Sequence, residues 1–154
     1  MPAEDVCLRA ATAADAGLLR AWRNDPEVVA ASFSGRRVEE EEHGGWLERV
    51  LADPGERLLV VEVDCEPAGQ VRLQDLGEGE VEVHVGLARD VRGRGLAAAV
   101  LELAAERAAE DCGAEALVAR IKPSNERSLR AFAAAGFAQR TRDAGEVLLE
   151  RRVG

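Results

Sequence analysis

The sequence predicts one α/β (α+β) domain with a central, mostly antiparallel mixed sheet of about seven strands, flanked by about four helices. The chain has 154 residues, of which 47% are hydrophobic and 32% are charged. This length and composition suit a single globular core rather than two domains or a disordered chain. Closely spaced segments in which apolar and polar residues alternate predict the sheet, and one long alanine-rich segment is the clearest of the helices.

Alternation of apolar and polar residues marks the strands, and turn residues separate them. The predicted strands cover residues 6–10, 58–63, 70–74, 80–87, 115–121, 137–141 and 147–153. Turns at residues 66–69 and 77–79 are short, so the second, third and fourth strands should form an antiparallel meander. A turn at residues 143–145 should join the last two strands as a hairpin.

Apolar positions three and four residues apart predict the helices. The main ones cover residues 12–23, 38–52, 96–112 and 124–135, with a short helical piece at 27–31. Thr12 is a suitable N-cap, and Pro26 should end the first helix because proline cannot continue the hydrogen-bond ladder. Gly44 and Gly45 predict a bend in the next helix, and Gly113 should end the long one.

Residues 81–98 carry the clearest chemical signal. An alternating strand leads through a short polar loop into the turn Gly93-Arg94-Gly95, which opens the long helix. Backbone N–H groups converge at such a helix start. With Arg92 and Arg94 beside them, they favour a phosphate or pyrophosphate guest.

The same turn also fits a dinucleotide-binding fingerprint, which needs a fully buried strand before it and an acidic residue after the next strand. Glu82 and His84 make one face of the preceding strand polar, and residues 121–123 offer no acid. We therefore disfavour that interpretation. A turn that merely joins a strand to a helix stays an alternative.

Two motifs resemble the GNAT superfamily of acetyl-CoA-dependent N-acetyltransferases. Arg92-x-x-Gly95-x-Ala97 resembles its [Q/R]-x-x-G-x-[G/A] motif, and residues 125–137 resemble its N-x-x-S-x-x-x-[FY]-x-x-x-G-F helix. The predicted order of elements also matches across essentially the whole chain. The resemblance implies a GNAT-like fold and an enzyme that transfers an acetyl group from acetyl-CoA to an amine.

The resemblance also implies which residues bind acetyl-CoA. The strand end would pair with the pantetheine arm as an added strand, and N–H groups of the turn would hold the pyrophosphate. The implied cofactor residues are Val85, Gly86, Leu87, Arg92, Gly93, Arg94, Gly95, Leu96, Ala97, Asn125 and Phe132. Asn125 would contact the pantetheine or order the site, and Phe132 would pack near the thioester. Alternatively, Asn125 is only a helix cap and Phe132 only a core residue.

The reaction needs a base for the amine and a backbone N–H for the oxyanion. Glu82 and His84 share a strand face and are the candidate bases, directly or through a water. The alternative is that both are merely exposed on a half-solvated strand. Many GNAT members place an acidic tyrosine on the second-motif helix, but this chain has no tyrosine and has Phe132 there. Ser128 or a water would then protonate the thiolate, itself a tolerable leaving group.

Residues 1–56 should form the acceptor side and residues 57–154 the acetyl-CoA-binding core of one domain spanning 1–154. Segments 22–28, 40–47 and 69–72 resemble acetyltransferases that act on nucleotide-linked 4-amino-sugars in pseudaminic-acid-type pathways. The implied acceptor residues are Arg23, Asn24, His43, Trp46 and Arg72. They offer charge, polar groups and an aromatic face. Trp46 could instead be simply a core residue.

Three functions are therefore open. The first is transfer to the primary amine of a nucleotide-linked amino sugar or similar small molecule, by direct attack in a ternary complex. The alternatives are a ribosomal-type protein N-terminal acetyltransferase and a non-catalytic acyl-CoA-binding module.

Composition narrows the partners. A net charge of -9 argues against nucleic acid, and no apolar run reaches the roughly 20 residues of a membrane span. Residues 1–5 lack the start of a signal peptide, so we expect a cytoplasmic protein. Cys7, Cys65 and Cys112 should be buried, reduced thiols, and they form no zinc signature with the two histidines, so no metal is expected. A homodimer is left open.

Overall fold

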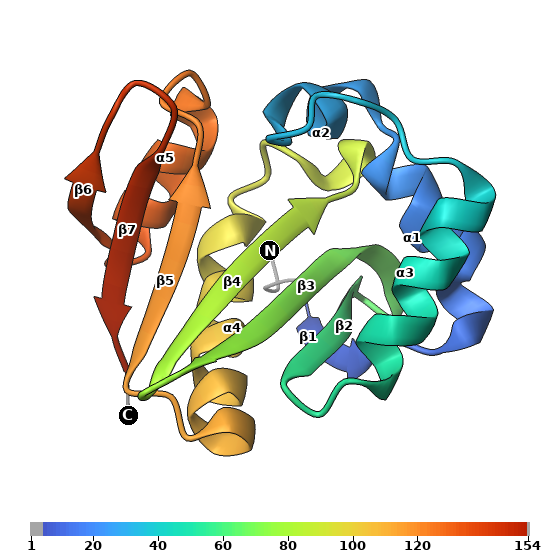
Figure 1. The fold of residues 1–154 in the computed structure, drawn as a ribbon, viewed down its shortest axis with the longest axis horizontal. Helices are drawn as coiled ribbons and strands as arrows, with labels where there is room; N and C mark the ends of the chain where they lie inside the picture. The colour runs from blue at the N-terminus through green and yellow to red at the C-terminus, as the bar shows by residue number, and fades with distance from the viewer. Residues whose placement is uncertain (1–4, 154) are drawn as a thin grey trace.

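In the computed structural model, which describes residues 5–153, seven strands form one sheet in the order β1-β2-β3-β4-β5-β7-β6 (Figure 1). The strands are β1 (Val6–Ala10), β2 (Glu56–Val63), β3 (Glu66–Gly77), β4 (Glu80–Leu87), β5 (Ala116–Ile121), β6 (Ala138–Arg142) and β7 (Val147–Arg152). All neighbours pair antiparallel except β4 and β5, which are parallel. This confirms the predicted fold class. The outermost residues of the predicted domain, 1–4 and 154, lie outside the described range, as do four of the five on which the signal-peptide expectation rests.

Five α-helices accompany the sheet within the described range. They are α1 (Ala16–Arg23), α2 (Pro26–Ala31), α3 (Glu40–Ala52), α4 (Leu96–Cys112) and α5 (Glu126–Ala134). Short 3-10 turns at Ala13–Asp15 and Arg89–Val91 precede α1 and α4. Thr12 and Asp15 form the capping box that starts the first of these turns. No helix within residues 5–153 is long and apolar enough to cross a membrane.

The two faces of the sheet carry different helices. Along β2, Leu59, Val61 and Val63 belong to the core cluster that contains α4, whereas Leu58 and Val60 pack with α1 and α3. This is the period-two alternation of a strand buried on both faces. On the α1 and α3 face, the helices cover β2 and β3 but leave β5 and β7 open (Figure 1).

Parallel pairing between β4 and β5 is short and positions the site. It joins only Glu80, Glu82 and the residue between them to the stretch from Ala116 to Val118. Antiparallel pairing of β4 with β3, in contrast, continues to Leu87. Beyond Glu82 the two parallel strands therefore separate, and Figure 1 shows them together at one end and apart at the other.

Three sequence predictions need correction. The turn predicted at residues 66–69 lies at Asp64 and Cys65, whose φ angles are +51° and +69°. Strand β3 runs straight through Pro67, because a register shift between Val61 and Glu62 of β2 accommodates a residue with no N–H to donate. Helix α3 begins at Glu40 rather than residue 38 and runs without interruption past the two glycines.

The cysteine prediction is wrong in part. All three thiols are free, but Cys7 and Cys65 are exposed and only Cys112 is half-buried. Cys7 lies on the outward side of the edge strand β1, and Cys65 forms part of a tight turn. Neither position faces the core. Strand alternation and turn geometry decide which residues are buried, and here they outweigh the apolar character of the thiol.

Asn24 fixes the connection between α2 and α3. Its side-chain amide donates to the Val38 carbonyl at 2.8 Å and accepts from the Val38 N–H at 2.7 Å. The residue is buried, so both bonds are shielded from water. This pair holds the loop after α2 against the end of α1.

We expect Asn24→Ala to lower the free energy of unfolding by about 2 kcal/mol, because it leaves both polar groups of Val38 without a partner. Urea denaturation measures this. Arg37→Ala, an exposed change in the same loop, is the control and should leave stability unchanged. Equal stability of the two variants would contradict the structural role of Asn24.

Candidate active site

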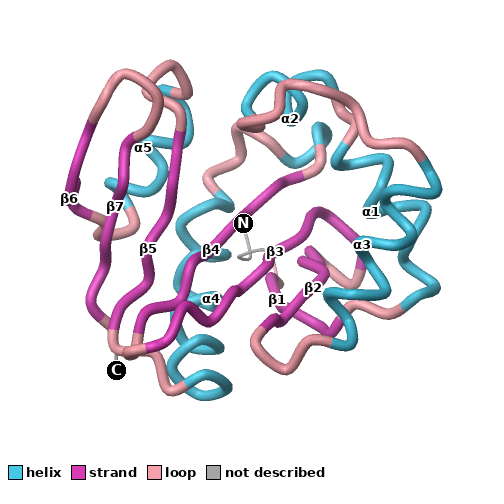
Figure 2. Tube along the Cα trace, viewed as in Figure 1, coloured by secondary structure: helices cyan, strands magenta, loops and turns pink. Residues whose placement is uncertain are grey.

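A cavity of about 600 Å³ opens where β4 and β5 separate. Its walls are β4 between Val83 and Gly86, β5 between Ala119 and Ile121, one face of α5, the face of α3 that carries His43 and Trp46, and the loop after α2. Figure 2 shows that the loops following α2 and β4 lie at the end of the sheet where β4 and β5 are apart. The cavity therefore joins the N-terminal helices to the divided sheet.

The cavity gathers most of the predicted side chains. On its lining are Arg23, His43, Trp46, Arg72, His84, Val85, Gly86, Asn125, Ser128 and Phe132. Asn24 is not on the lining, since its amide is engaged with Val38, and its predicted contact with the acceptor is replaced by support of the loop. Glu82 lies behind His84, and Leu87 and the glycine turn lie beyond the cavity.

Glu82 and His84 touch. Glu82 Oε2 is 2.8 Å from His84 Nε2, while Arg72 Nη2 lies 3.2 Å from the same nitrogen. A guanidinium can only donate and a carboxylate only accept, so Nε2 cannot satisfy both at once. Because an unprotonated Nε2 would place its lone pair against the closer, anionic group, we assign the proton to Nε2. The other ring nitrogen, Nδ1, then keeps the lone pair of the neutral ring.

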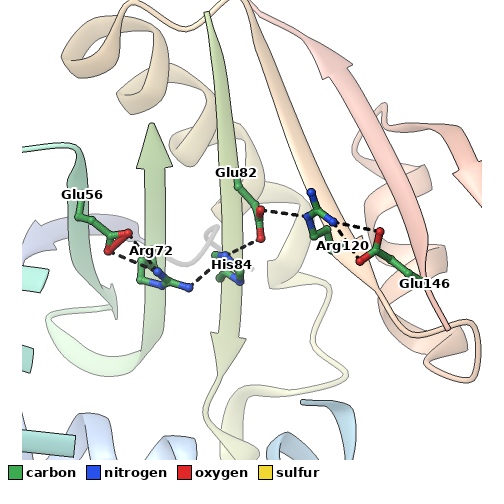
Figure 3. Close-up of polar contacts among 6 residues, drawn as sticks. All are labelled: Glu56, Arg72, Glu82, His84, Arg120 and Glu146. Carbon is green, nitrogen blue, oxygen red and sulfur yellow. Dashed lines mark hydrogen bonds and ion pairs between the residues drawn. The ribbon is translucent and has the colours of Figure 1, made fainter. Parts of the chain in front are cut away.

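His84 stands in a row of alternating charges that crosses the sheet (Figure 3). On one side, Glu56 holds Arg72 with an Nη1–Oε1 distance of 3.1 Å. On the other, Arg120 bridges Glu82 at 3.3 Å and Glu146 at 3.1 Å. The row runs from β2 to the residue before β7 along the α1 and α3 face of the sheet, and it passes from the part covered by these helices to the open part at β5. It neutralises each charge with its neighbours and fixes the orientation of Glu82.

These contacts keep Glu82 ionised. The hydrogen bond from His84 lowers the pKa of the Glu82 carboxyl below its ordinary value, and Arg120 adds to the effect against the opposing influence of burial. Glu82 is therefore a buried carboxylate at neutral pH, paired on both sides. Its stabilising contribution is present above the ordinary range of a glutamate and is lost as the pH falls through the lowered pKa.

His43 and Trp46 line the opposite wall. Their rings lie 5.3 Å apart, and the Arg72 guanidinium lies 5.9 Å from the Trp46 ring. Burial lowers the pKa of His43, and the nearby charges of Arg20 and Arg23 lower it further. His43 is thus a neutral ring near pH 7. Trp46 offers an aromatic face inside the cavity.

The glycine turn lies outside the cavity and is exposed. Gly93 and Gly95 have φ angles of +77° and +74°, a region that side chains rarely adopt. Helix α4 starts there without a side-chain cap, so its first N–H groups stay open. The turn has the geometry of an anion site at a helix start.

Arg92 departs from the prediction that its side chain faces the anion. Its guanidinium lies 2.8 Å from Glu27 and 3.4 Å from Asp25, and it donates to the Leu87 carbonyl at 3.0 Å. The acidic side chains at the start of α2 lie close enough to form ion pairs with it. The side chain of Arg92 therefore anchors α2 to the turn and is turned away from the exposed N–H groups.

The open edge of β4 and the start of α5 complete the site. From Val83 to Leu87, β4 pairs with β3 on one side but with no described strand on the other, which leaves backbone groups available to an added strand. Asn125 caps α5 by accepting from the Ser128 N–H at 3.3 Å. Phe132 is both core and lining, since it packs edge-on against Phe137 at 4.9 Å and also faces the cavity.

Sequence reasoning missed Glu56, Arg120 and Glu146. Arg120 has the same strand parity as Val118, which pairs with Glu82, so the alternation carried a signal. Using it requires the β4–β5 register, which no local pattern reveals. Glu146 sits next to the final turn and has no recognisable motif.

Comparison with known proteins fixes the family. A family model described as an acetyltransferase (GNAT) domain matches residues 5–138. Among curated sequences, no relative matches the chain. The chain belongs to the GNAT acetyltransferase family, and is thus an N-acetyltransferase with acetyl-CoA as its co-substrate.

Solved structures share its fold at low sequence identity. Spermidine N-acetyltransferase from Vibrio cholerae, in complex with CoA and spermine, has a TM-score of 0.87 at 16% identity, over 96% of this chain and 95% of that one. The aminoglycoside acetyltransferase AAC(6')-Ib in complex with coenzyme A has a TM-score of 0.82 at 22% identity, over 96% of this chain and 95% of that one. A domain from Methanocaldococcus jannaschii has a TM-score of 0.82 at 20% identity, over 98% of this chain and 100% of that one. These confirm the predicted GNAT-like fold.

The protonation of His84 can be tested directly. We expect ¹⁵N NMR of the neutral ring to show the Nε2–H tautomer, because the Glu82 carboxylate is the nearer partner. Glu82→Gln should lower the population of that tautomer. His43, the second of the two histidines in the chain, is the internal reference and should not change. An Nδ1–H tautomer in the wild type would instead mean that Arg72 dominates.

Proposed function

We propose that this enzyme acetylates the primary amine of a small, nucleotide-linked amino sugar, by direct attack on acetyl-CoA in a ternary complex. The observation that carries the proposal is the cavity itself. It combines His84, backed by an ionised Glu82, with an aromatic face at Trp46 and a wall of cationic and polar side chains. A base, an aromatic surface and polar groups are what a polar amine on a sugar ring requires.

In this proposal the coenzyme lies along the divided edge of β4. Backbone groups of Val85, Gly86 and Leu87 pair with the pantetheine arm, and N–H groups from Arg92 to Ala97 hold the pyrophosphate. The open β4 edge and the exposed glycine turn support this placement. Asn125 at the start of α5 and Phe132 in its last turn border the same path.

His84 is the base and Glu82 its positioning partner. Nδ1 of His84 takes a proton from the amine, directly or through a water, while Glu82 holds Nε2–H and stabilises the resulting cation. The amine nitrogen attacks the thioester carbonyl carbon, and a backbone N–H stabilises the oxyanion. The C–S bond then breaks, leaving an amide and a thiolate, which Ser128 or a water protonates.

The shape of the cavity favours a small molecule over a protein terminus. A peptide would need a groove that extends from the N-terminal helices to the last hairpin. No described residue of β6 or β7 lines the cavity, which is bounded instead by Arg23, His43 and the loop after α2. Spermine and kanamycin, named with two of the neighbouring structures, are polycations, and a wall rich in arginine does not suit them.

A thiol-release assay over a panel of amines tests the function. We expect a nucleotide-linked amino sugar to stimulate coenzyme A release more than an N-terminal peptide, spermine or an aminoglycoside. Tight coenzyme A binding without turnover on any amine would reject the enzyme in favour of a binding module. Preference for the peptide would reject the small-molecule acceptor.

Gly95→Val should abolish coenzyme A binding. A Cβ at Gly95 would meet no protein atom, so its cost comes from the φ of +74° and from crowding the bound pyrophosphate. Gly113→Val is the matched control, because Gly113 has a φ of +62° and equally open space at the other end of α4. Both changes should cost about 1–2 kcal/mol of stability. Calorimetric titration should show lost affinity only for Gly95→Val, and unchanged affinity would refute the pyrophosphate site.

His84→Ala should lower kcat by about 100-fold or more while leaving acetyl-CoA affinity unchanged, because the base acts only on the amine. Glu82→Gln should lower kcat less, since it changes the orientation and not the base. Gln74→Ala is the control for the assay, because Gln74 lies on the same face of β3 as Arg72 but does not line the cavity. Wild-type turnover in both variants would remove the assignment.

A further inference from the structure

Arginine dominates the charged lining of the cavity. Five arginines and one glutamate face it: Arg23, Arg36, Arg49, Arg72, Arg120 and Glu42. This sign is opposite to that of the whole chain, whose net charge is -9. A local excess of positive charge on an acidic protein is a property of the cavity and does not follow from composition.

Three of the five arginines have carboxylate partners. Arg72 is paired with Glu56, and Arg120 with Glu82 and Glu146. On the surface, Arg36 is paired with Glu42 at 3.2 Å.

The remaining two arginines lie on the α1 and α3 side. Neither Arg23 nor Arg49 forms an ion pair with any residue in the range 5–153. Arg23 donates to the Ser34 hydroxyl at 3.2 Å, and its Nη1 is buried without a hydrogen-bond partner. A buried guanidinium nitrogen without an acceptor is unfavourable until an anion reaches it.

The glycine pair of α3 makes room for the second arginine. Arg49 folds back along the helix, so its Nη1 lies 3.4 Å from the position that a Cβ on Gly45 would take. The guanidinium therefore lies along the same helix face as Glu42 and Trp46, which also line the cavity. Gly45, predicted to bend the helix, instead leaves space for this side chain.

An exposed aromatic ring borders this region. Phe33 is 55% exposed, lines the cavity and lies next to Ser34 in the loop after α2. A solvent-exposed phenyl ring beside cationic groups matches the two parts of a nucleotide, since a base stacks on an aromatic face and phosphates bind guanidinium groups.

We propose that Arg23, Arg49 and Ser34 form an anion subsite for the diphosphate of the acceptor, with Phe33 as the stacking face for its base. This inference rests on the proposed function and deepens it: the acceptor is an anionic amine carrying a nucleoside diphosphate, and polycationic amines are excluded by charge. The anion binds on the α1 and α3 wall, and the amine reaches across the cavity to His84.

Binding of uridine diphosphate and inorganic pyrophosphate to the coenzyme A-saturated protein tests the subsite. Saturation fills the coenzyme's own pyrophosphate site, so added probe reports the second one. We expect Arg49→Ala and Arg23→Ala each to weaken binding of both probes about tenfold or more. Arg49 is exposed, so its variant should fold normally. Arg37→Ala, a nearby arginine outside the lining, should change nothing.

Phe33→Ala separates the two parts of the site. It should weaken the binding of uridine diphosphate and leave the binding of pyrophosphate unchanged, because only the nucleotide has a base that can stack on the ring. No probe binding to the saturated protein, or equal binding by Arg49→Ala and Arg37→Ala, would overturn the subsite. Equal loss of both probes in Phe33→Ala would overturn the stacking role.

Kinetics distinguish this inference from the proposed function. We expect an amino sugar with its nucleotide to have a kcat/KM well above that of the same sugar without it, and Arg49→Ala to erase the difference. Equal kcat/KM for both sugars overturns the subsite while leaving an amine acetyltransferase. Arginine-dependent probe binding without acetylation of any amino sugar supports the subsite and rejects the proposed acceptor chemistry.

Discussion

The short parallel pairing between β4 and β5 determines where everything else lies. Three residue pairs hold the strands together, and beyond Glu82 they diverge because β4 stays with β3 while β5 stays with β7. The divergence creates both an unpaired backbone edge and a cavity. Longer pairing would close the cavity with strand hydrogen bonds, and shorter pairing would separate Glu82 from Arg120.

The charged row crosses the sheet at this junction. Glu82 lies at the last β4–β5 pair and bonds to one residue from each strand, His84 and Arg120. Its pairing on both sides keeps it ionised, which makes it a fixed acceptor rather than a group that exchanges protons. The roles that we propose for Glu82 and His84 differ because of the position of this one carboxylate.

Local patterns predicted most of the elements and the glycine turn before α4 well. Alternation, the caps at Thr12 and Asn125, and the end of α4 at Gly113 are encoded within a few residues. Features that depend on distant contacts were out of reach. Pro67 resembled a turn residue because the register shift that accommodates it becomes visible only when β3 is paired with β2. The role of Arg120 likewise depends on the β4–β5 register.

Side-chain roles were harder still. Asn24 and Arg92 both occupy motif positions, yet the side chain of each contacts other protein residues. Asn24 forms hydrogen bonds with Val38, and Arg92 forms ion pairs with Asp25 and Glu27. Their partners lie 14 residues or more away along the chain, or on an element whose position the sequence does not specify. Residue type alone therefore suggested a ligand contact where the fold uses a structural one.

Helix α2 belongs to both halves of the site. Its N-terminal acids hold Arg92 beside the coenzyme turn and Arg127 at the start of α5, and Lys122 at the end of β5 donates to the carbonyl of Ala30. The chain then leaves α2 directly into the loop of Phe33 and Ser34. One short helix thus connects the two proposed ligand regions through direct contacts. A substitution at Glu27 would therefore affect the binding of both substrates in this proposal, although its side chain lines neither binding region.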